Sequence, residues 1–246
     1  AYPIVLSTRD HGYLFQTYPI YSRLNYTIAG LHLGEQVYTL DASEGFMGFG
    51  KLPARCYNGG ARNVTEIGDI IWLNADSLFE QKITSITIEG IENGKLKGTM
   101  FTMPSYFESI DIRREVEKTG ESKYADELNK QYKGITVSDL KIDNLDSLEV
   151  PLMLQFRFTA DADNADLVYF NPVLIDAYKK NPFVAAERKF PVEMPYVSDE
   201  MLTLNFVLPD DYVVDELPQS AKAKLNDNDG YFEYLLNQVD NRIQFR

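Results

Sequence analysis

Cysteine, histidine and tryptophan are nearly absent from this sequence of 246 residues. It contains one Cys, two His and one Trp. The single cysteine, Cys56, excludes any disulfide within the chain. One cysteine and two distant histidines also make a zinc site an unfavourable interpretation. We therefore expect no cofactor.

Long apolar runs are missing as well. No stretch approaches the roughly 18 apolar residues from which a membrane-spanning helix is predicted, and the mean hydropathy of −0.28 is ordinary for a globular protein. We therefore expect no membrane insertion. The chain opens directly as a strand, without a signal peptide. We expect it to begin inside a domain, and its last residues predict that it ends inside a strand.

Cations are scarce relative to anions. The sequence has 24 Lys and Arg against 37 Asp and Glu, which gives a net charge of −13. Nucleic acids and anionic membrane surfaces both require Lys and Arg for binding, so this charge disfavours them as partners. Solubility through net charge is the favoured interpretation of the acidic excess.

The stretch from Leu24 to Ser43 predicts a β-hairpin. Residues alternate in character on both sides of Gly34-Glu35, which would form a two-residue turn. In that register Tyr26 and Asp41 lie on one face of the sheet as diagonal neighbours, roughly 7–8 Å apart. A slip of one residue would place them on opposite faces.

This hairpin resembles the second half of a transglutaminase-like, papain-type catalytic core. In that family an upstream Cys is the nucleophile, a His opens a strand, and an Asp closes the next strand and orients the imidazole. The residues that carry the resemblance are Leu24-Asn25-Tyr26 at the His strand and Leu40-Asp41-Ala42-Ser43 at the Asp strand. Residues 49–59 resemble the segment that follows the Asp strand.

The sequence departs from the family's chemistry at two of three positions. Tyr26 stands where the family has His, and a phenol with a reference pKa near 10 is a poor general base. No Cys precedes Tyr26, and Cys56, which follows Asp41, is predicted to be a buried structural residue. His32 lies roughly 20 Å along the strand from Tyr26. Asp41 and Tyr26 are therefore our candidate catalytic positions, interpreted as relics of the Asp and His.

Residues 76–246 carry the pattern of an antiparallel β-sandwich, with short alternating strands separated by polar turns. Asn93-Gly94 is the strongest hairpin turn in the chain. Strands are predicted at 2–8, 82–89, 95–103, 106–116, 135–142, 149–160, 167–170, 202–208, 212–217, 221–225, 231–237 and 242–246, and one helix at 121–132. Residues 181–192 resemble the signature of the β-domain of unknown function that follows the catalytic core in the same proteins.

The predicted fold is therefore mainly β. Residues 1–65 would form the last strands of a papain/transglutaminase-like α+β core, and residues 76–246 the antiparallel β-sandwich.

Two Asp- and Asn-rich clusters contain hard oxygen ligands suited to Ca²⁺. Asp161, Asp163 and Asp166 belong to the first, and residues 226–230 form the second. Neither has the twelve-residue EF-hand pattern. Asp, Asn and Gly also form turns for local reasons, so a plain turn is favoured and calcium binding is the alternative.

The resemblance to the transglutaminase-like family, and the departures from it, imply two functions, and the composition suggests a third. The favoured one is a non-catalytic structural or binding portion of a secreted transglutaminase-like protein of a bacterial cell envelope, periplasmic or extracellular. Its partner would be a peptide, a glycan or an envelope protein. The first alternative is a cysteine peptidase or amidase whose Cys lies in an upstream segment. The second is a carbohydrate-binding module. Aromatic residues make up 13% of the sequence, and exposed aromatic rings could stack on sugar rings.

Overall fold

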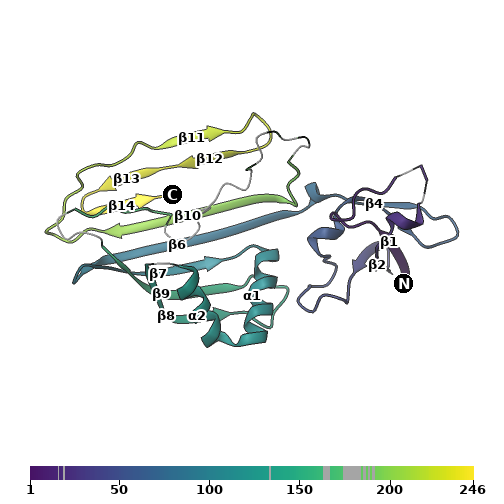
Figure 1. Cartoon of the computed structure of the whole chain (residues 1–246), viewed down its shortest axis with the longest axis horizontal. Helices are drawn as coiled ribbons and strands as arrows, with labels where there is room; N and C mark the ends of the chain where they lie inside the picture. The colour runs from purple at the N-terminus through teal and green to yellow at the C-terminus, as the bar shows by residue number, and fades with distance from the viewer. Residues whose placement is uncertain are drawn as a thin grey trace.

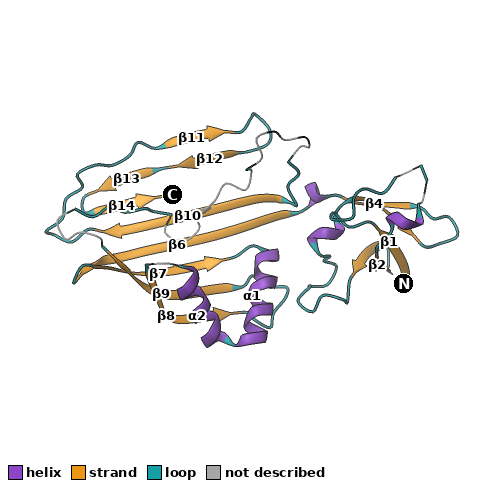
Figure 2. Cartoon of the chain, in the orientation of Figure 1, coloured by secondary structure: helices purple, strands orange, loops and turns teal. Residues whose placement is uncertain are grey.

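We analysed a computed structural model of the chain. It describes residues 1–15, 17–18, 20–132, 134–162, 167–173, 184, 187, 189 and 192–246. Figure 1 shows a smaller lobe that holds the N-terminus and a larger lobe that holds the C-terminus. The described chain is mainly β, as predicted, with a minor helical part (Figure 2).

The smaller lobe is a five-stranded sheet with the order β3-β2-β1-β4-β5, in which every pairing is antiparallel. Its strands are β1 (Tyr2–Leu6), β2 (Tyr26–Leu33), β3 (Gln36–Leu40), β4 (Gly59–Asn63) and β5 (Ile70–Leu73). Three short 3-10 helices accompany them, η1 (Tyr21–Arg23), η2 (Ala54–Cys56) and η3 (Ala75–Ser77). The core of this lobe consists of Ile4, Leu6, Ile28, Leu52, Cys56, Ala61 and Leu73.

The predicted hairpin is confirmed in its register. Leu33 pairs with Gln36 and Ala29 with Leu40, so Gly34-Glu35 is the two-residue turn. Gly34 has a φ of +61°, in the left-handed region that glycine adopts without a Cβ penalty. The turn therefore sets which residues of the two strands share a face.

The larger lobe is built on a seven-stranded sheet with the order β13-β14-β10-β6-β7-β9-β8. These strands are β6 (Phe79–Glu92), β7 (Lys95–Met103), β8 (Ile135–Asp143), β9 (Met153–Asp161), β10 (Val197–Val207), β13 (Leu236–Val239) and β14 (Arg242–Phe245). A further hairpin of β11 (Ala221–Lys224) and β12 (Tyr231–Tyr234) forms a separate two-stranded sheet. Leu235, between β12 and β13, exchanges two backbone hydrogen bonds with Arg246, at 2.8 and 2.9 Å.

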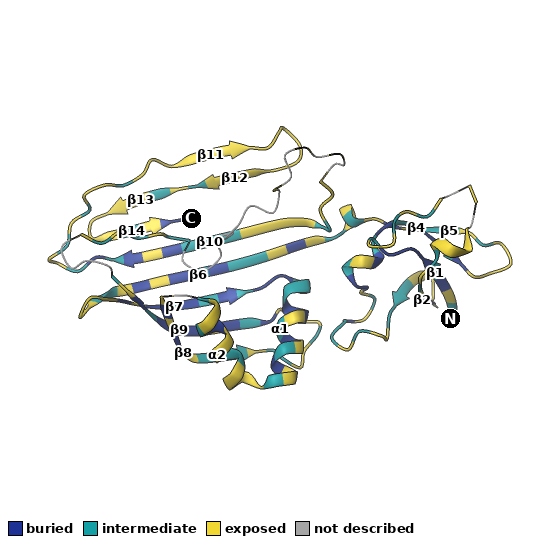
Figure 3. Ribbon diagram, viewed as in Figure 1, coloured by how far each residue is buried: buried dark blue, intermediate teal, exposed yellow. Residues whose placement is uncertain are grey.

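The antiparallel β-sandwich predicted for residues 76–246 is wrong in two respects. Strand β10 pairs with β6 in parallel, from Val197 opposite Phe79 to Phe206 opposite Ile88. In addition, the second layer within the described residues is helical, because Leu128 and Tyr124 of a helix pack on the buried face of the sheet. Figure 3 shows that buried face beneath the helices. The lobe is thus a mixed sheet with helices on one side.

The helical layer contains α1 (Tyr106–Thr119) and α2 (Glu121–Gln131). The helix predicted at 121–132 is confirmed, whereas the strand predicted at 106–116 is wrong. The alternation around Ile110 resembles a strand locally, but the buried residues of α1 are Ser109, Ile110, Arg113 and Val116, which share one helical face. Ser105 caps the helix by accepting a hydrogen bond from the Glu108 amide at 3.4 Å.

Most of the remaining strand predictions agree with the structure in place, with shifts of a few residues at their ends. The Asn93-Gly94 turn is confirmed, with positive φ angles of 52° and 71°. The strands predicted at 167–170 and 212–217 are wrong, because both segments are irregular.

The buried core of this lobe is separate from that of the smaller lobe and centres on Ile86, Ile88, Met100, Phe156, Phe158, Leu204 and Phe206. The boundaries at 65 and 76 remain predictions.

Candidate functional site

Tyr26 and Asp41 are in direct contact, as the hairpin register predicts. Tyr26 opens β2, and Asp41 follows the last residue of β3. The Tyr26 hydroxyl donates a hydrogen bond of 2.6 Å to Oδ2 of Asp41. The tyrosine thus reaches the carboxylate across the sheet face, from the position where the resemblance places a histidine.

Ser43 completes the polar environment of the Asp41 carboxylate. The Ser43 amide and hydroxyl both donate to Oδ1 of Asp41, at 2.9 and 2.7 Å. Burial alone would raise the pKa of Asp41, but the hydrogen bonds from Tyr26 and Ser43, with the charge of Arg55, hold that pKa below its ordinary value. Asp41 is therefore an ionised acceptor that is already occupied.

Arg55 covers the tyrosine from the other side. Its Nη2 atom donates to the Tyr26 hydroxyl at 3.0 Å, and its guanidinium carbon lies 5.0 Å from the centre of the ring. Burial, followed by the hydrogen bond to Asp41, raises the pKa of Tyr26 above its ordinary value. The phenol therefore stays protonated near neutral pH and cannot act as a general base there.

Cys56 is a buried core residue. Its side chain is buried in the core of the smaller lobe. Burial is the largest cause that raises the pKa of the thiol to about 12, and the charge of Asp41 adds to it. The prediction that Cys56 is buried is confirmed.

Neither histidine contacts Tyr26 or Asp41. The His11 ring contacts the Ser22 carbonyl at 3.1 Å, and the His32 ring packs on Tyr2 at 5.3 Å between centroids. In the described residues the site thus contains a carboxylate, two hydroxyls and a guanidinium, without a thiolate or an imidazole. This set can hold a fixed hydrogen-bond network, but it lacks the nucleophile–base pair of acyl transfer.

The network continues from the site into the larger lobe. Arg55 donates to Oε1 of Glu44 at 2.7 Å, and Arg114 of α1 donates to the second oxygen of Glu44 at 3.3 Å. Arg114 also pairs with Asp111 at 2.7 Å. Glu44 therefore bridges one arginine from each lobe.

A second set of contacts joins the lobes beside this network. The backbone amides of Gly48 and Phe49 donate to the Tyr106 hydroxyl and the Glu149 carboxylate, at 2.7 and 2.8 Å. A Cβ atom at Gly48 would lie 2.8 Å from Oε1 of Glu149, so a larger residue here would force the Glu149 side chain to move. The segment after Asp41 is thereby tied to the start of α1.

Sequence reasoning missed the contributions of Glu44, Arg55 and Arg114. Arg55 reaches Glu44 through the path of the irregular segment between β3 and β4, and Arg114 reaches it through the packing of one lobe on the other. No local pattern signals either contact. Only the Tyr26–Asp41 contact has a local signal in the sequence. That signal is the two-residue alternation of side chains along the hairpin strands, which places both residues on one face.

A cavity of about 520 Å³ lies next to Asp41. It is lined by the ends of β1, β2 and β3 and by the turn that follows Asp41, including Tyr2, Ile28, Leu40 and Ser43. The site is thus accessible to a small group, although its carboxylate is already hydrogen-bonded.

The first calcium candidate cluster lies only partly within the described residues. Asp161 ends β9 and pairs with Lys95 at 3.5 Å, whereas Asp163 and Asp166 lie outside the described residues. In the second cluster, Oδ1 of Asn226 accepts hydrogen bonds from the amides of Asn228 and Asp229, which is a turn geometry. No group of three or more His, Cys, Asp and Glu side chains suited to a metal occurs in the described part of the chain.

Comparison with known families found a match for the C-terminal third of the chain. Residues 166–246 match the family DUF3858, described as a domain of unknown function with a solved structure. The prediction of a domain of unknown function is supported for this segment, although the signature at 181–192 falls mostly outside the described residues. Nothing supports the transglutaminase-like core, which remains a prediction for residues 1–65.

Searches among curated proteins and among solved structures found no match to this chain. None of the helices in the described ranges has the length and hydrophobicity required to span a membrane.

Proposed function

We propose that this chain is a non-catalytic structural and binding portion of a secreted, transglutaminase-like protein of the cell envelope. The observation that carries the proposal is the hydrogen bond from the Tyr26 hydroxyl to Asp41. A catalytic histidine at this position would accept a proton. The Tyr26 phenol has a raised pKa and instead donates its proton in a hydrogen bond to the Asp41 carboxylate.

The surroundings of the pair support a structural role. The carboxylate of Asp41 has Tyr26 and Ser43 as fixed donors, and Arg55 connects the tyrosine to Glu44 and so to α1. In a working triad the acid orients an imidazole that must remain free to move a proton. Here the acid forms part of the contacts that hold the two lobes together.

The test is a peptidase and glutaminase assay on the purified chain and on Tyr26→His. We expect no turnover from either protein, because an imidazole beside Asp41 without a thiolate cannot form an acyl-enzyme. Asp41→Ala is the control. Turnover by the wild type that disappears in Asp41→Ala would show that the site is catalytic and would contradict the proposal.

The cavity beside Asp41 favours a second candidate, the cysteine peptidase or amidase of transglutaminase type. Its volume of about 520 Å³ would admit a side chain or a substrate carbonyl. In that case a Cys from a segment outside this sequence would be the nucleophile, Asp41 would orient, and Tyr26 would be an unorthodox partner. Adding the chain to a separately made upstream segment should then produce activity that requires Asp41.

A further inference from the structure

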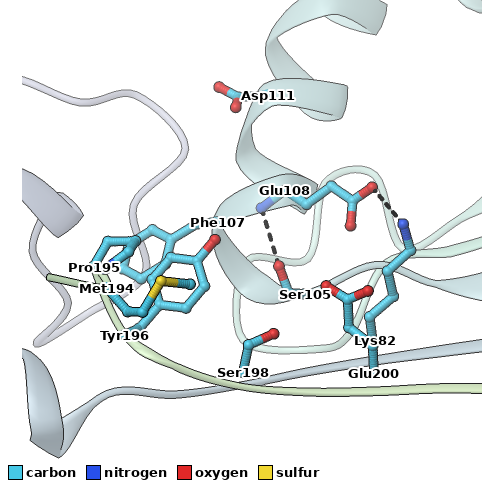
Figure 4. A pocket seen from close by; sticks show the side chains of 10 residues that line it. All are labelled: Lys82, Ser105, Phe107, Glu108, Asp111, Met194, Pro195, Tyr196, Ser198 and Glu200. Atoms are coloured by element: carbon cyan, nitrogen blue, oxygen red, sulfur yellow. Dashed lines mark hydrogen bonds and ion pairs between the residues drawn. The ribbon is translucent and has the colours of Figure 1, made fainter. Parts of the chain in front are cut away.

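A second cavity, of about 560 Å³, lies in the larger lobe away from Tyr26 and Asp41. Its walls come from the start of α1, from β6, and from β10 with the segment that leads into it (Figure 4). Its lining falls into an apolar side and a charged side, and the two sides face the same space.

The apolar side is an aromatic stack. The rings of Phe107 and Tyr196 lie parallel within 18°, with their centroids 5.5 Å apart, and Met194 and Pro195 lie beside them. Arg9 of the smaller lobe donates to the carbonyls of Glu193 and Met194, each at 3.3 Å. This wall is thus held in place from outside the cavity.

The charged side carries an excess of negative charge. Glu108, Asp111 and Glu200 line it, against one cation, Lys82. Lys82 pairs with Glu108 at 3.1 Å and Asp111 pairs with Arg114. Among the described residues, Glu200 makes no side-chain hydrogen bond or ion pair and is exposed. One carboxylate of the cavity is therefore available for a ligand.

The start of α1 does not provide an anion site here. The amide of Phe107 already donates to the buried carboxylate of Glu80 at 3.1 Å, and the amide of Glu108 donates to Ser105. The amides that would hold a phosphate at a helix N-terminus are thus used within the protein. The available charge in this cavity attracts cations instead.

We propose that this cavity binds a cationic group on an apolar stem, an ammonium or guanidinium such as a lysine or arginine side chain carries. The stem packs on Phe107 and Tyr196, and the charged head lies against Glu200. Aromatic faces and carboxylates both attract such a head. This site goes beyond the proposed function, since it would bind its ligand whether or not Asp41 takes part in chemistry.

The experiment is an NMR titration of the ¹⁵N-labelled full chain at low salt. The probes are Nα-acetyl-lysine amide, 1,5-diaminopentane, neutral Nα-acetyl-norleucine amide and inorganic phosphate. We expect saturable amide shifts at the start of α1 and of β10 with the two cations, and none with norleucine amide or phosphate. Tighter binding of lysine amide would indicate a peptide side chain, and tighter binding of the diamine a free amine; both outcomes support the proposal.

Two charge variants make the test specific. Glu200→Gln should weaken binding about two- to fivefold, the range for an exposed ion pair, and Glu200→Lys should abolish it. Glu216→Lys makes the same charge change at an exposed position outside the cavity, and it should leave binding within about twofold of the wild type. Absence of shifts with both cations, equal binding of norleucine amide, binding of phosphate alone, or cation binding unchanged in Glu200→Lys would each overturn the proposal.

Discussion

At the scale of single residues, the candidate site shows how hydrogen-bond donors around a carboxylate set its role. A histidine beside Asp41 would be oriented by it, whereas Tyr26 gives it a proton donor. The neighbours reinforce this, because Arg55 donates to the phenol oxygen and Ser43 donates to the acid. Burial, followed by the hydrogen bond to Asp41, raises the pKa of Tyr26, and that same hydrogen bond helps to lower the pKa of Asp41. The pair is therefore a stable donor and acceptor.

Asp41→Asn should lower the free energy of unfolding at neutral pH by about 1 kcal/mol, the loss of charge-assisted hydrogen bonds at a site partly screened by solvent. The pKa of Asp41 is lower in the folded chain than in the unfolded chain. Its contribution is therefore complete above the ordinary Asp value of about 3.9 and is lost as the pH falls through the folded value. Urea unfolding of the wild type and the variant at pH 7 and pH 3 measures the difference in their free energies of unfolding. A difference that is as large at pH 3 as at pH 7 would contradict the prediction.

Cys56 should react slowly with a thiol reagent at pH 7 in the folded protein and rapidly in urea. A thiol pKa of about 12 leaves roughly a thousandfold less thiolate than a free cysteine has, and the sulfur is also buried. Labelling at equal rates in the two conditions would show a reactive thiolate instead.

At the scale of elements, α1 organises the larger lobe through a buried arginine. Arg113 is 2% exposed, and it donates to the backbone carbonyls of Asn144, Leu145, Ser147 and Val150 and to the Ser109 hydroxyl. Burial lowers the pKa of this guanidinium, yet an arginine remains charged at neutral pH. One side chain thus satisfies the acceptors of the connection between β8 and β9.

Arg113→Met should reduce the free energy of unfolding by about 3 kcal/mol, because it removes a buried guanidinium that donates to four partly buried backbone carbonyls at once. The neighbouring Arg114→Met is the matched control. Arg114 makes ion pairs from an exposed position, which are worth at most about 1 kcal/mol. Chemical denaturation of both variants measures the two losses. Equal losses would show that the carbonyl contacts of Arg113 do not matter.

At the scale of the whole molecule, the family match and the sheet have different boundaries. The match begins at residue 166, so it includes β10 to β14 but excludes β6 to β9. Strand β10 lies between β14 and β6 in the sheet, and it pairs with β6 along ten residues. The core residues Leu204 and Phe206 pack in one cluster with Ile86 and Ile88. The matched segment therefore supplies three of the seven strands of a shared sheet.

Residues 166–246 alone should not fold, whereas residues 76–246 should fold cooperatively. Without β6, strand β10 keeps β14 but loses the longer of its two backbone pairings and exposes its apolar face. Circular dichroism melting curves of the two fragments test this, with the full chain as the reference. A cooperative melt of the shorter fragment would show that the matched segment is an independent domain.

Local patterns in the sequence were sufficient for several features of this protein. They determined the mainly β character, the two tight hairpin turns, the contact of Tyr26 with Asp41 and the helix at 121–131. These features depend on the spacing of apolar residues along a strand or helix and on the residues that form tight turns. Both signals lie within a few neighbouring positions of the sequence. The burial of Cys56 also followed from its chemistry, because an unpaired cysteine usually behaves as a small apolar residue.

Only the tertiary structure decided the rest. The strand predicted at 106–116 is a helix because its Arg113 face packs on a loop more than thirty residues away. The parallel pairing of β6 with β10 joins segments separated by more than a hundred residues. The Glu44 bridge and the cavity of Phe107, Tyr196 and Glu200 likewise combine distant segments. Such contacts depend on which surfaces meet after folding, and a local period carries no information about them.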